Sequence, residues 1–286
     1  MGDTVMKVKA HSKINLTLNV VGKRADGYHD VDMIMQTLDF GDVVHVEKTL
    51  SQIEVTGTGS SVPYDETNIA YKAAKLFFDV TGIRGGAKIH IEKNIPVCAG
   101  MAGGSTDAAA VLKCLNALYG KPLKTKVLVK ISAKLGADVP YCIIGGTARA
   151  QGVGEVITPL KPFGKVWTVV VKPCISISTP WAYSSLKYDT MAHPDTEAAA
   201  KSIEEGRRSG VYSLMANSFE ESVFAKYPEI SQIKDSLLSM DADGALMSGS
   251  GSTVFGLFED KTKAKEAYDY FKTKYKEVIL THTCNE

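Results

Sequence analysis

Residues 94–106 read Asn-Ile-Pro-Val-Cys-Ala-Gly-Met-Ala-Gly-Gly-Ser-Thr, and an apolar pattern with helical spacing follows them directly. Glycine lets a backbone approach an anion closely, and the N–H groups at a helix start point toward that anion. The segment therefore predicts a phosphate cradle between a strand and a helix that Ser105 or Thr106 caps and Gly120 ends. The predicted cradle comprises Pro96, Val97, Cys98, Ala99, Gly100, Met101, Ala102, Gly103, Gly104, Ser105 and Thr106.

This cradle differs from two common nucleotide-binding motifs. It lacks the Gly-Lys-Ser/Thr ending of a P-loop, and it lacks the dinucleotide-binding pattern GxGxxG. A tight strand-to-helix turn that needs small residues for packing would contain the same glycines, so that alternative stays open. A second glycine turn, residues 248–252, lies between apolar strands. It could close over the same phosphates or over an acceptor, or it could be an ordinary hairpin turn.

Three polar side chains lie on one face of a predicted strand near the N-terminus. His11, Lys13 and Asn15 are spaced two residues apart, so they point to the same side of the strand, while Ile14 and Leu16 face the other side. That face either lines a polar site or forms a solvated edge. Further along, Asp138 stands among apolar residues and needs a cation, a hydrogen-bond donor or a helix-cap position. Lys13 is a natural partner, because a nearby cation would hold Asp138 ionised and able to accept a hydroxyl proton.

Composition limits the class of protein. The chain has 286 residues, 44% hydrophobic and 23% charged, with a net charge of +1. A dedicated nucleic-acid binder usually carries a strong basic excess, so we expect small-molecule partners and no nucleic acid. Five scattered cysteines contain no CxxC pair, which predicts no zinc site and no disulfide framework. With no signal-peptide pattern and no apolar run of membrane length, we expect a cytoplasmic protein that does not contact a membrane.

The pattern of elements favours an α+β fold. Strands are predicted over residues 5–10, 14–20, 31–40 and 43–46, with a turn at Gly41-Asp42. Helices are predicted over residues 68–80, 126–135, 230–240 and 263–274. Strands and helices do not alternate as in a βαβ sheet. A cluster of proline and glycine near residue 160 predicts two domains, residues 1–160 and 161–286.

Several sequence blocks together resemble the GHMP kinases. They are residues 10–16 with 22–29, residues 95–110, residues 135–140 and residues 247–253, and their order covers nearly the whole chain. The first block resembles, within that superfamily, the branch that phosphorylates 4-diphosphocytidyl-2-C-methyl-D-erythritol in the non-mevalonate isoprenoid pathway. The resemblance implies an N-terminal domain like the second domain of ribosomal protein S5, followed by a GHMP C-terminal domain. The cradle departs from the common form at Met101, Ala102 and Thr106, where leucine, glycine and serine are usual.

The resemblance also implies roles. Lys13 and Asp138 would be the catalytic pair, and the cradle would bind ATP with Mg²⁺, without a dedicated set of metal-binding side chains. Asn15 matches a position near the acceptor. Residues 179–183 resemble a Thr-Pro segment of the substrate site. The substrate-site positions that the resemblance implies are Tyr28 and His29 for the cytosine, Thr179, and Tyr183 as the second aromatic beside the cytosine.

Other functions remain to be weighed against this one. A GHMP kinase for another small alcohol would share the cradle. A catalytically silent nucleotide sensor would have lost the catalytic pair, whereas both Lys13 and Asp138 are present. An RNA-binding protein is disfavoured by the near-zero net charge. We expect a monomer or a weak homodimer.

Overall fold

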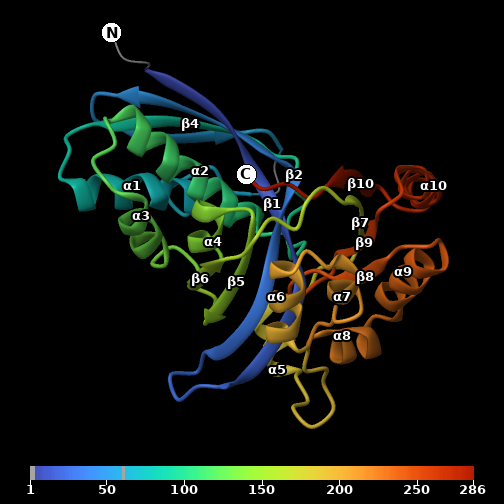
Figure 1. Cartoon of the computed structure of the whole chain (residues 1–286). Helices are drawn as coiled ribbons and strands as arrows, with labels where there is room; N and C mark the ends of the chain where they lie inside the picture. Colours follow the sequence, from blue (N-terminus) through green and yellow to red (C-terminus); the bar gives the residue numbers. More distant parts are fainter. Residues whose placement is uncertain (1–3, 60–61) are drawn as a thin grey trace. The chain divides into compact units, whose positions relative to one another are not determined.

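The computed structural model describes residues 4–59 and 62–286 and divides the chain into two compact units (Figure 1). The first unit comprises the chain up to Ser12 together with Phe40–Val97 and Ala102–Ile144. The second unit comprises Lys13–Asp39, Cys98–Met101 and Gly145–Glu286. Two long strands, β1 (Val5–Lys23) and β2 (His29–Thr49), contribute to both units. The mixture of helices and strands confirms the predicted α+β class, while the predicted domain boundary at residue 160 stays a prediction.

The first unit is a sheet covered by helices. The second half of β2 pairs antiparallel with β4 (Gly86–Glu92), which pairs parallel with β3 (Ile53–Gly57). The helices are α1 (Ile69–Thr81), α2 (Gly103–Leu118), α3 (Thr125–Ser132) and α4 (Val139–Ile144). Both α1 and α2 contact β4, and α1 packs along α2 (Figure 1). The core between sheet and helices includes Val44, Val46, Ile89, Phe77 and Leu112.

Local sequence explains these elements. On β2, Val44 and Val46 are buried while His45 and Glu47 point away from the core, as the period of a strand requires. Helix α1 begins where the Asn68 side chain accepts a hydrogen bond from the N–H of Ala70, at 2.8 Å. It ends at Gly82, whose φ of 66° is the left-handed conformation that glycine adopts without strain.

The second unit contains two sets of paired strands. The first half of β2 pairs antiparallel with β5 (Thr147–Gly152), which pairs with β6 (Val156–Pro159). A four-stranded antiparallel sheet has the order β10 (Glu277–His282), β7 (Trp167–Lys172), β9 (Val254–Phe258) and β8 (Gly244–Met247). Helices α9 (Pro228–Ser239) and α10 (Lys261–Lys272) pack on this sheet. The remaining helices are α5 (Thr179–Ser184), α6 (Thr196–Glu204), α7 (Arg208–Tyr212) and α8 (Glu220–Lys226).

The predicted turn at Gly41-Asp42 is wrong, because β2 continues through it. A close backbone approach explains the glycine: a Cβ at Gly41 would lie 2.2 Å from the carbonyl oxygen of Ala10 on β1. Asp42 is buried within the strand, where its carboxylate accepts hydrogen bonds from backbone N–H groups of Asn94 and Ile95. Within residues 4–59 and 62–286, no helix is long and apolar enough to cross a membrane.

Candidate active site

Helix α2 begins three or four residues earlier than the sequence predicts. Ala102 is the N-cap residue, in the left-handed conformation at φ 58°, and the helix starts at Gly103. The capping prediction for Ser105 and Thr106 is therefore wrong. Both lie in the first turn, where the Thr106 hydroxyl donates to the carbonyl oxygen of Gly103 at 2.9 Å. Because alanine has no side-chain oxygen, no side-chain cap accepts from the first N–H groups of this helix.

The part of the predicted cradle that belongs to the second unit contacts the second glycine turn. A Cβ at Gly100 would lie 2.1 Å from the carbonyl oxygen of Ser248, and the Ser248 hydroxyl donates to the Gly100 carbonyl at 2.9 Å. Gly100 also has a φ of 69°. The turn connects β8 and β9 as a hairpin, and it also packs against the cradle. Only glycine fits Gly100 in this contact.

Lys13 and Asn15 are buried on β1, so the alternative of a solvated edge is wrong for these two residues. Lys13 is 3% exposed and Asn15 is fully buried. The Lys13 ammonium donates to Oδ1 of Asn15 at 2.7 Å, and the same oxygen accepts the N–H of Gly249 at 3.1 Å. The Lys13 backbone N–H also donates to the Met101 carbonyl at 3.3 Å. Within one unit, three predicted sequence blocks therefore meet at Lys13: the early strand, the cradle and the glycine turn.

Asp138 lies in the first unit, in the turn directly before α4, and is half-buried. Its backbone carbonyl accepts the N–H of Cys142 at 3.1 Å, which starts the helix. This position fits a helix cap as well as a catalytic carboxylate. The predicted pairing of Asp138 with Lys13 stays a prediction.

Two residues predicted to contact cytosine lie against each other. The His29 ring stacks on Tyr183 with ring centroids 4.5 Å apart and planes inclined by 23°. Partial burial lowers the pKa of His29, and the nearby charge of Lys23 lowers it further. The neighbouring Tyr28 is 65% exposed. At the start of α5, the Thr179 hydroxyl lies 3.2 Å from that of Ser250 in the glycine turn.

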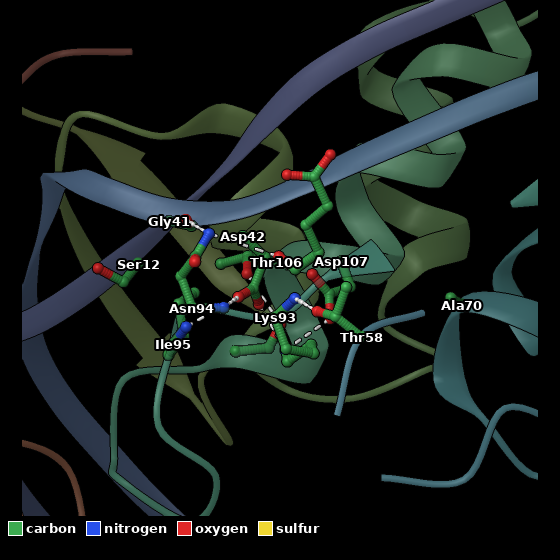
Figure 2. Close-up of polar contacts among 12 residues, drawn as sticks. Ser12, Gly41, Asp42, Thr58, Ala70, Lys93, Asn94, Ile95, Thr106 and Asp107 are labelled. Atoms are coloured by element: carbon green, nitrogen blue, oxygen red, sulfur yellow. Dashed lines mark hydrogen bonds and ion pairs between the residues drawn. The ribbon is translucent and has the colours of Figure 1, made fainter. Parts of the chain in front are cut away.

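A buried charge triad beside the cradle was not predicted. Figure 2 shows the Lys93 ammonium between the carboxylates of Asp42 and Asp107. The Lys93–Asp107 distance is 2.8 Å, and the side chains of the three residues are at most 10% exposed. The triad connects both flanks of the cradle. Asp42 holds the N–H groups of Asn94 and Ile95 at 2.6 and 2.8 Å, and Asp107 lies in the second turn of α2.

Charge balance within this triad shifts its pKa values. Burial raises the pKa of Asp107 to about 7, although the Lys93 ammonium opposes that shift. Burial alone would lower the pKa of Lys93, but the carboxylates of Asp107 and Asp42 outweigh it and raise the pKa. The sequence carried one signal for this site, because Asp107 is an acidic residue followed by three alanines in an apolar helix. Such a residue requires a buried partner.

Comparison with known proteins agrees with this geometry. Residues 68–146 match the N-terminal domain of the GHMP kinases, and residues 197–277 match their C-terminal domain. A 4-diphosphocytidyl-2-C-methyl-D-erythritol kinase of Clostridium botulinum (strain Loch Maree / Type A3) is 46% identical over 279 residues, covering 97% of this chain and 100% of the relative.

Solved structures give the same result. A crystal structure of 4-(cytidine 5'-diphospho)-2C-methyl-D-erythritol kinase superposes with a TM-score of 0.84 at 33% identity, over 98% of this chain and 100% of that one. A homoserine kinase from Cytophaga hutchinsonii has a TM-score of 0.78 at 17% identity, covering 99% of this chain and 95% of that one, and shows the shared fold alone.

The fold and the matches to both GHMP kinase domains define a kinase of the GHMP class. Within that class, the chain belongs to the family of 4-diphosphocytidyl-2-C-methyl-D-erythritol kinases. The predicted family, fold and enzyme class are thereby confirmed. The roles of individual site residues stay predictions.

Proposed function

We propose that this chain transfers the γ-phosphoryl group of ATP to the 2-hydroxyl of 4-diphosphocytidyl-2-C-methyl-D-erythritol, in the non-mevalonate isoprenoid pathway. The observation that carries this proposal is the near full-length identity, 46% over 97% of the chain, with a relative named for that kinase. The buried Lys13–Asn15 pair and the stacked His29–Tyr183 pair support it, because catalysis and base recognition would each need such groups.

ATP would bind through its phosphates at the residues of the predicted cradle. The fit rests on two observations: the α2 start lacks a side-chain cap, and a Cβ at Gly104 would have only one neighbour within 4 Å, at 3.4 Å. Backbone N–H groups of Gly103, Gly104 and Ser105 would donate to phosphate oxygens. The hydroxyl of Ser105 or Thr106 would contact phosphate or the Mg²⁺ that the phosphates carry. Bound Mg²⁺ would neutralise charge on the phosphate oxygens.

Lys13 and Asp138 would carry the chemistry at the acceptor. Asp138 would accept or orient the proton of the attacking hydroxyl. Lys13 would stabilise the negative charge that develops during transfer, and its contact with Asn15 would fix the direction of its ammonium. Because phosphoryl transfer depends mainly on position and electrostatics, a buried and oriented lysine is well suited to this role.

The cytidyl end of the acceptor would bind at the aromatic residues of the second unit. Tyr28 and Tyr183 would stack on the cytosine, and His29 would hydrogen-bond its edge. A neutral imidazole offers one donor and one acceptor, and the lowered pKa of His29 favours that form at pH 7. Thr179 would lie at the same end, with Asn15 nearer the acceptor hydroxyl. The enzyme would act in the cytoplasm as a monomer or weak homodimer.

A coupled assay of ADP release tests the substrate. We expect the purified protein to turn over with 4-diphosphocytidyl-2-C-methyl-D-erythritol and to give background rates with homoserine and with mevalonate. Product analysis by ³¹P NMR would show a new phosphomonoester signal on the erythritol moiety. Turnover of homoserine or mevalonate with no turnover of the cytidyl compound would overturn the proposal.

A further inference from the structure

Asn217 is a completely buried amide whose side chain uses every hydrogen-bonding group it has. Its Nδ2 donates to the carbonyl oxygens of Met247 and Gly249, each at 2.8 Å. Its Oδ1 accepts the N–H of Phe219 at 3.0 Å. Both carbonyls that Asn217 holds belong to the end of β8 and the glycine turn that follows it. The side chain therefore fixes the backbone path into that turn.

The backbone around Asn217 is tied to the strand that carries Lys13. Residues 216–218 bridge β1 in parallel at Leu18, where the Leu18 N–H donates to Ala216 at 3.0 Å and the Leu18 carbonyl accepts from Ser218 at 2.9 Å. The Ser218 hydroxyl also accepts the N–H of Val20 at 3.0 Å. Asn217 is thus fixed in position relative to β1, and its side chain fixes the glycine turn relative to the same strand.

The glycine turn also contacts β1 directly, through one hydrogen bond to the Asn15 side chain. The Gly249 N–H donates to Asn15 Oδ1 at 3.1 Å, and the Lys13 ammonium donates to the same oxygen at 2.7 Å. The Asn15 amide nitrogen is directed to the sulfur of Met33 at 3.2 Å, which fixes the orientation of the amide. The contacts therefore form a closed ring: β1, Asn217, Gly249, Asn15 and β1 again.

We propose that Asn217 is a positioning residue for Lys13, acting through the Gly249 peptide and the Asn15 side chain. This inference rests on the proposed function, which gives Lys13 its role in phosphoryl transfer. The carbonyls of Met247 and Gly249 flank the Ser248–Gly249 peptide, whose N–H donates to Asn15. Without the two Asn217 donors, this peptide shifts, and the Asn15 oxygen loses one of its two donors. The bond from Asn15 to the Lys13 ammonium then changes its direction.

Two substitutions of Asn217 remove different parts of its hydrogen bonding. Asn217→Ser removes both amide N–H donors and leaves only a shorter hydroxyl, whereas Asn217→Asp keeps the acceptor for the Phe219 N–H and loses the donors. We expect kcat to fall by about 10- to 100-fold in both, because small misplacements of a catalytic group cost that much. We expect KM for ATP and KM for the cytidyl substrate each to change by less than about 3-fold, since the proposal gives Asn217 no contact with either substrate.

Asn116 provides a matched control. It is also a buried asparagine that fixes a backbone segment, with bonds to the N–H and the carbonyl of Leu123, both at 2.9 Å. Asn116→Ser should lower Tm by an amount similar to Asn217→Ser and leave kcat within about 2-fold. Equal losses of kcat in both variants would mean that Asn217 acts through fold stability alone, and would overturn its positioning role.

A double-mutant cycle with Asn15→Ala gives the decisive readout. If Asn217 acts through Asn15, the double variant should be no more than about 2-fold slower than the slower single variant. Independent effects, in which the two fold-losses multiply, would refute the relay. The assay of the wild-type protein distinguishes failure of the proposed function from failure of the positioning role. No turnover of the cytidyl compound by wild type refutes the proposed function, whereas an active wild type with a fully active Asn217→Ser refutes only the positioning role.

Discussion

His29 and Tyr183 lie 154 residues apart in the sequence, yet their rings stack with centroids 4.5 Å apart. Rings at that separation are in direct contact, so no third ring fits between them. A bound cytosine would therefore stack on another face of Tyr183 or displace His29. Tyr183 is itself supported by Phe219, whose ring meets it edge-on at 4.9 Å. The exposed ring of Tyr28 can stack on the opposite face of the cytosine.

Removing the Tyr183 ring should therefore weaken binding of the acceptor and leave binding of ATP unchanged. Base–aromatic stacking is worth about 1–3 kcal/mol by alanine substitution, so Tyr183→Ala should raise KM for the cytidyl substrate by about 5- to 150-fold. Tyr183→Phe keeps the ring and should stay within about 3-fold of wild type. Tyr270→Ala on α10, a 40% exposed tyrosine, serves as the surface control. Initial rates at saturating ATP and at saturating acceptor separate the two KM values, and equal changes in both would contradict the cytosine assignment.

Asp138→Asn should abolish turnover while ATP still binds. The substitution keeps the size of the side chain and removes the charge that would accept or orient the hydroxyl proton. We expect kcat to fall by at least about 100-fold. Because Asp138 directly precedes α4, Tm must be measured. Asparagine is a helix-capping residue of similar quality to aspartate, so we expect little loss of stability. Calorimetric titration with ADP checks nucleotide binding. Near-normal kcat would refute the catalytic role of Asp138.

Asp107 should make stability depend on pH near neutrality. Burial raises its folded pKa to about 7 from an ordinary value of 3.8, so the folded protein holds this proton more tightly than the unfolded chain does. The stabilisation from that proton is complete below about pH 4 and is lost as the pH rises through about 7. The unfolding free energy of wild type should therefore fall between pH 5 and pH 8 relative to Asp107→Asn, which has no titrating group at this position.

Urea unfolding at pH 5, 6, 7 and 8 measures this difference directly. Glu259→Gln is the control, because Arg208 and Tyr212 hold the Glu259 carboxylate and the pKa of that group is lowered. That carboxylate is ionised throughout the range, so the control curve should run parallel to wild type. If the curves of wild type and Asp107→Asn are also parallel, Asp107 does not titrate in this range and the charge balance of the triad is different.

Local sequence predicted the parts of the site that one segment encodes. Glycines followed by a helix indicated the cradle, and period-two alternation placed Lys13 and Asn15 on one face of a strand. Contacts distant in sequence could not be predicted this way. Gly41-Asp42 is a local turn signal, and only the close approach of Ala10 shows why the strand continues. Asn217 follows Leu214-Met215-Ala216 with no local pattern that marks it, and its side chain bonds to a backbone carbonyl 30 residues later.

The glycine at position 104 separates the two explanations of the cradle that the sequence left open. If small residues are needed only for packing, an added methyl group should destabilise the fold. The structure shows space for it: a Cβ at Gly104 would meet only Cγ2 of Ile69, at an ordinary 3.4 Å. Gly104 also lies in the first turn of α2, where alanine is a better helix former than glycine by up to about 1 kcal/mol.

We therefore expect Gly104→Ala to keep or raise Tm and to raise KM for ATP by about 10-fold or more, because the methyl group would obstruct phosphate at the helix start. Gly100→Ala is the contrasting variant. Its methyl group would lie 2.1 Å from the Ser248 carbonyl at a positive φ, so it should lower stability by about 2 kcal/mol or more. Thermal unfolding with and without ADP measures both properties. An unchanged KM for ATP in Gly104→Ala would favour the packing explanation and remove Gly104 from the cradle.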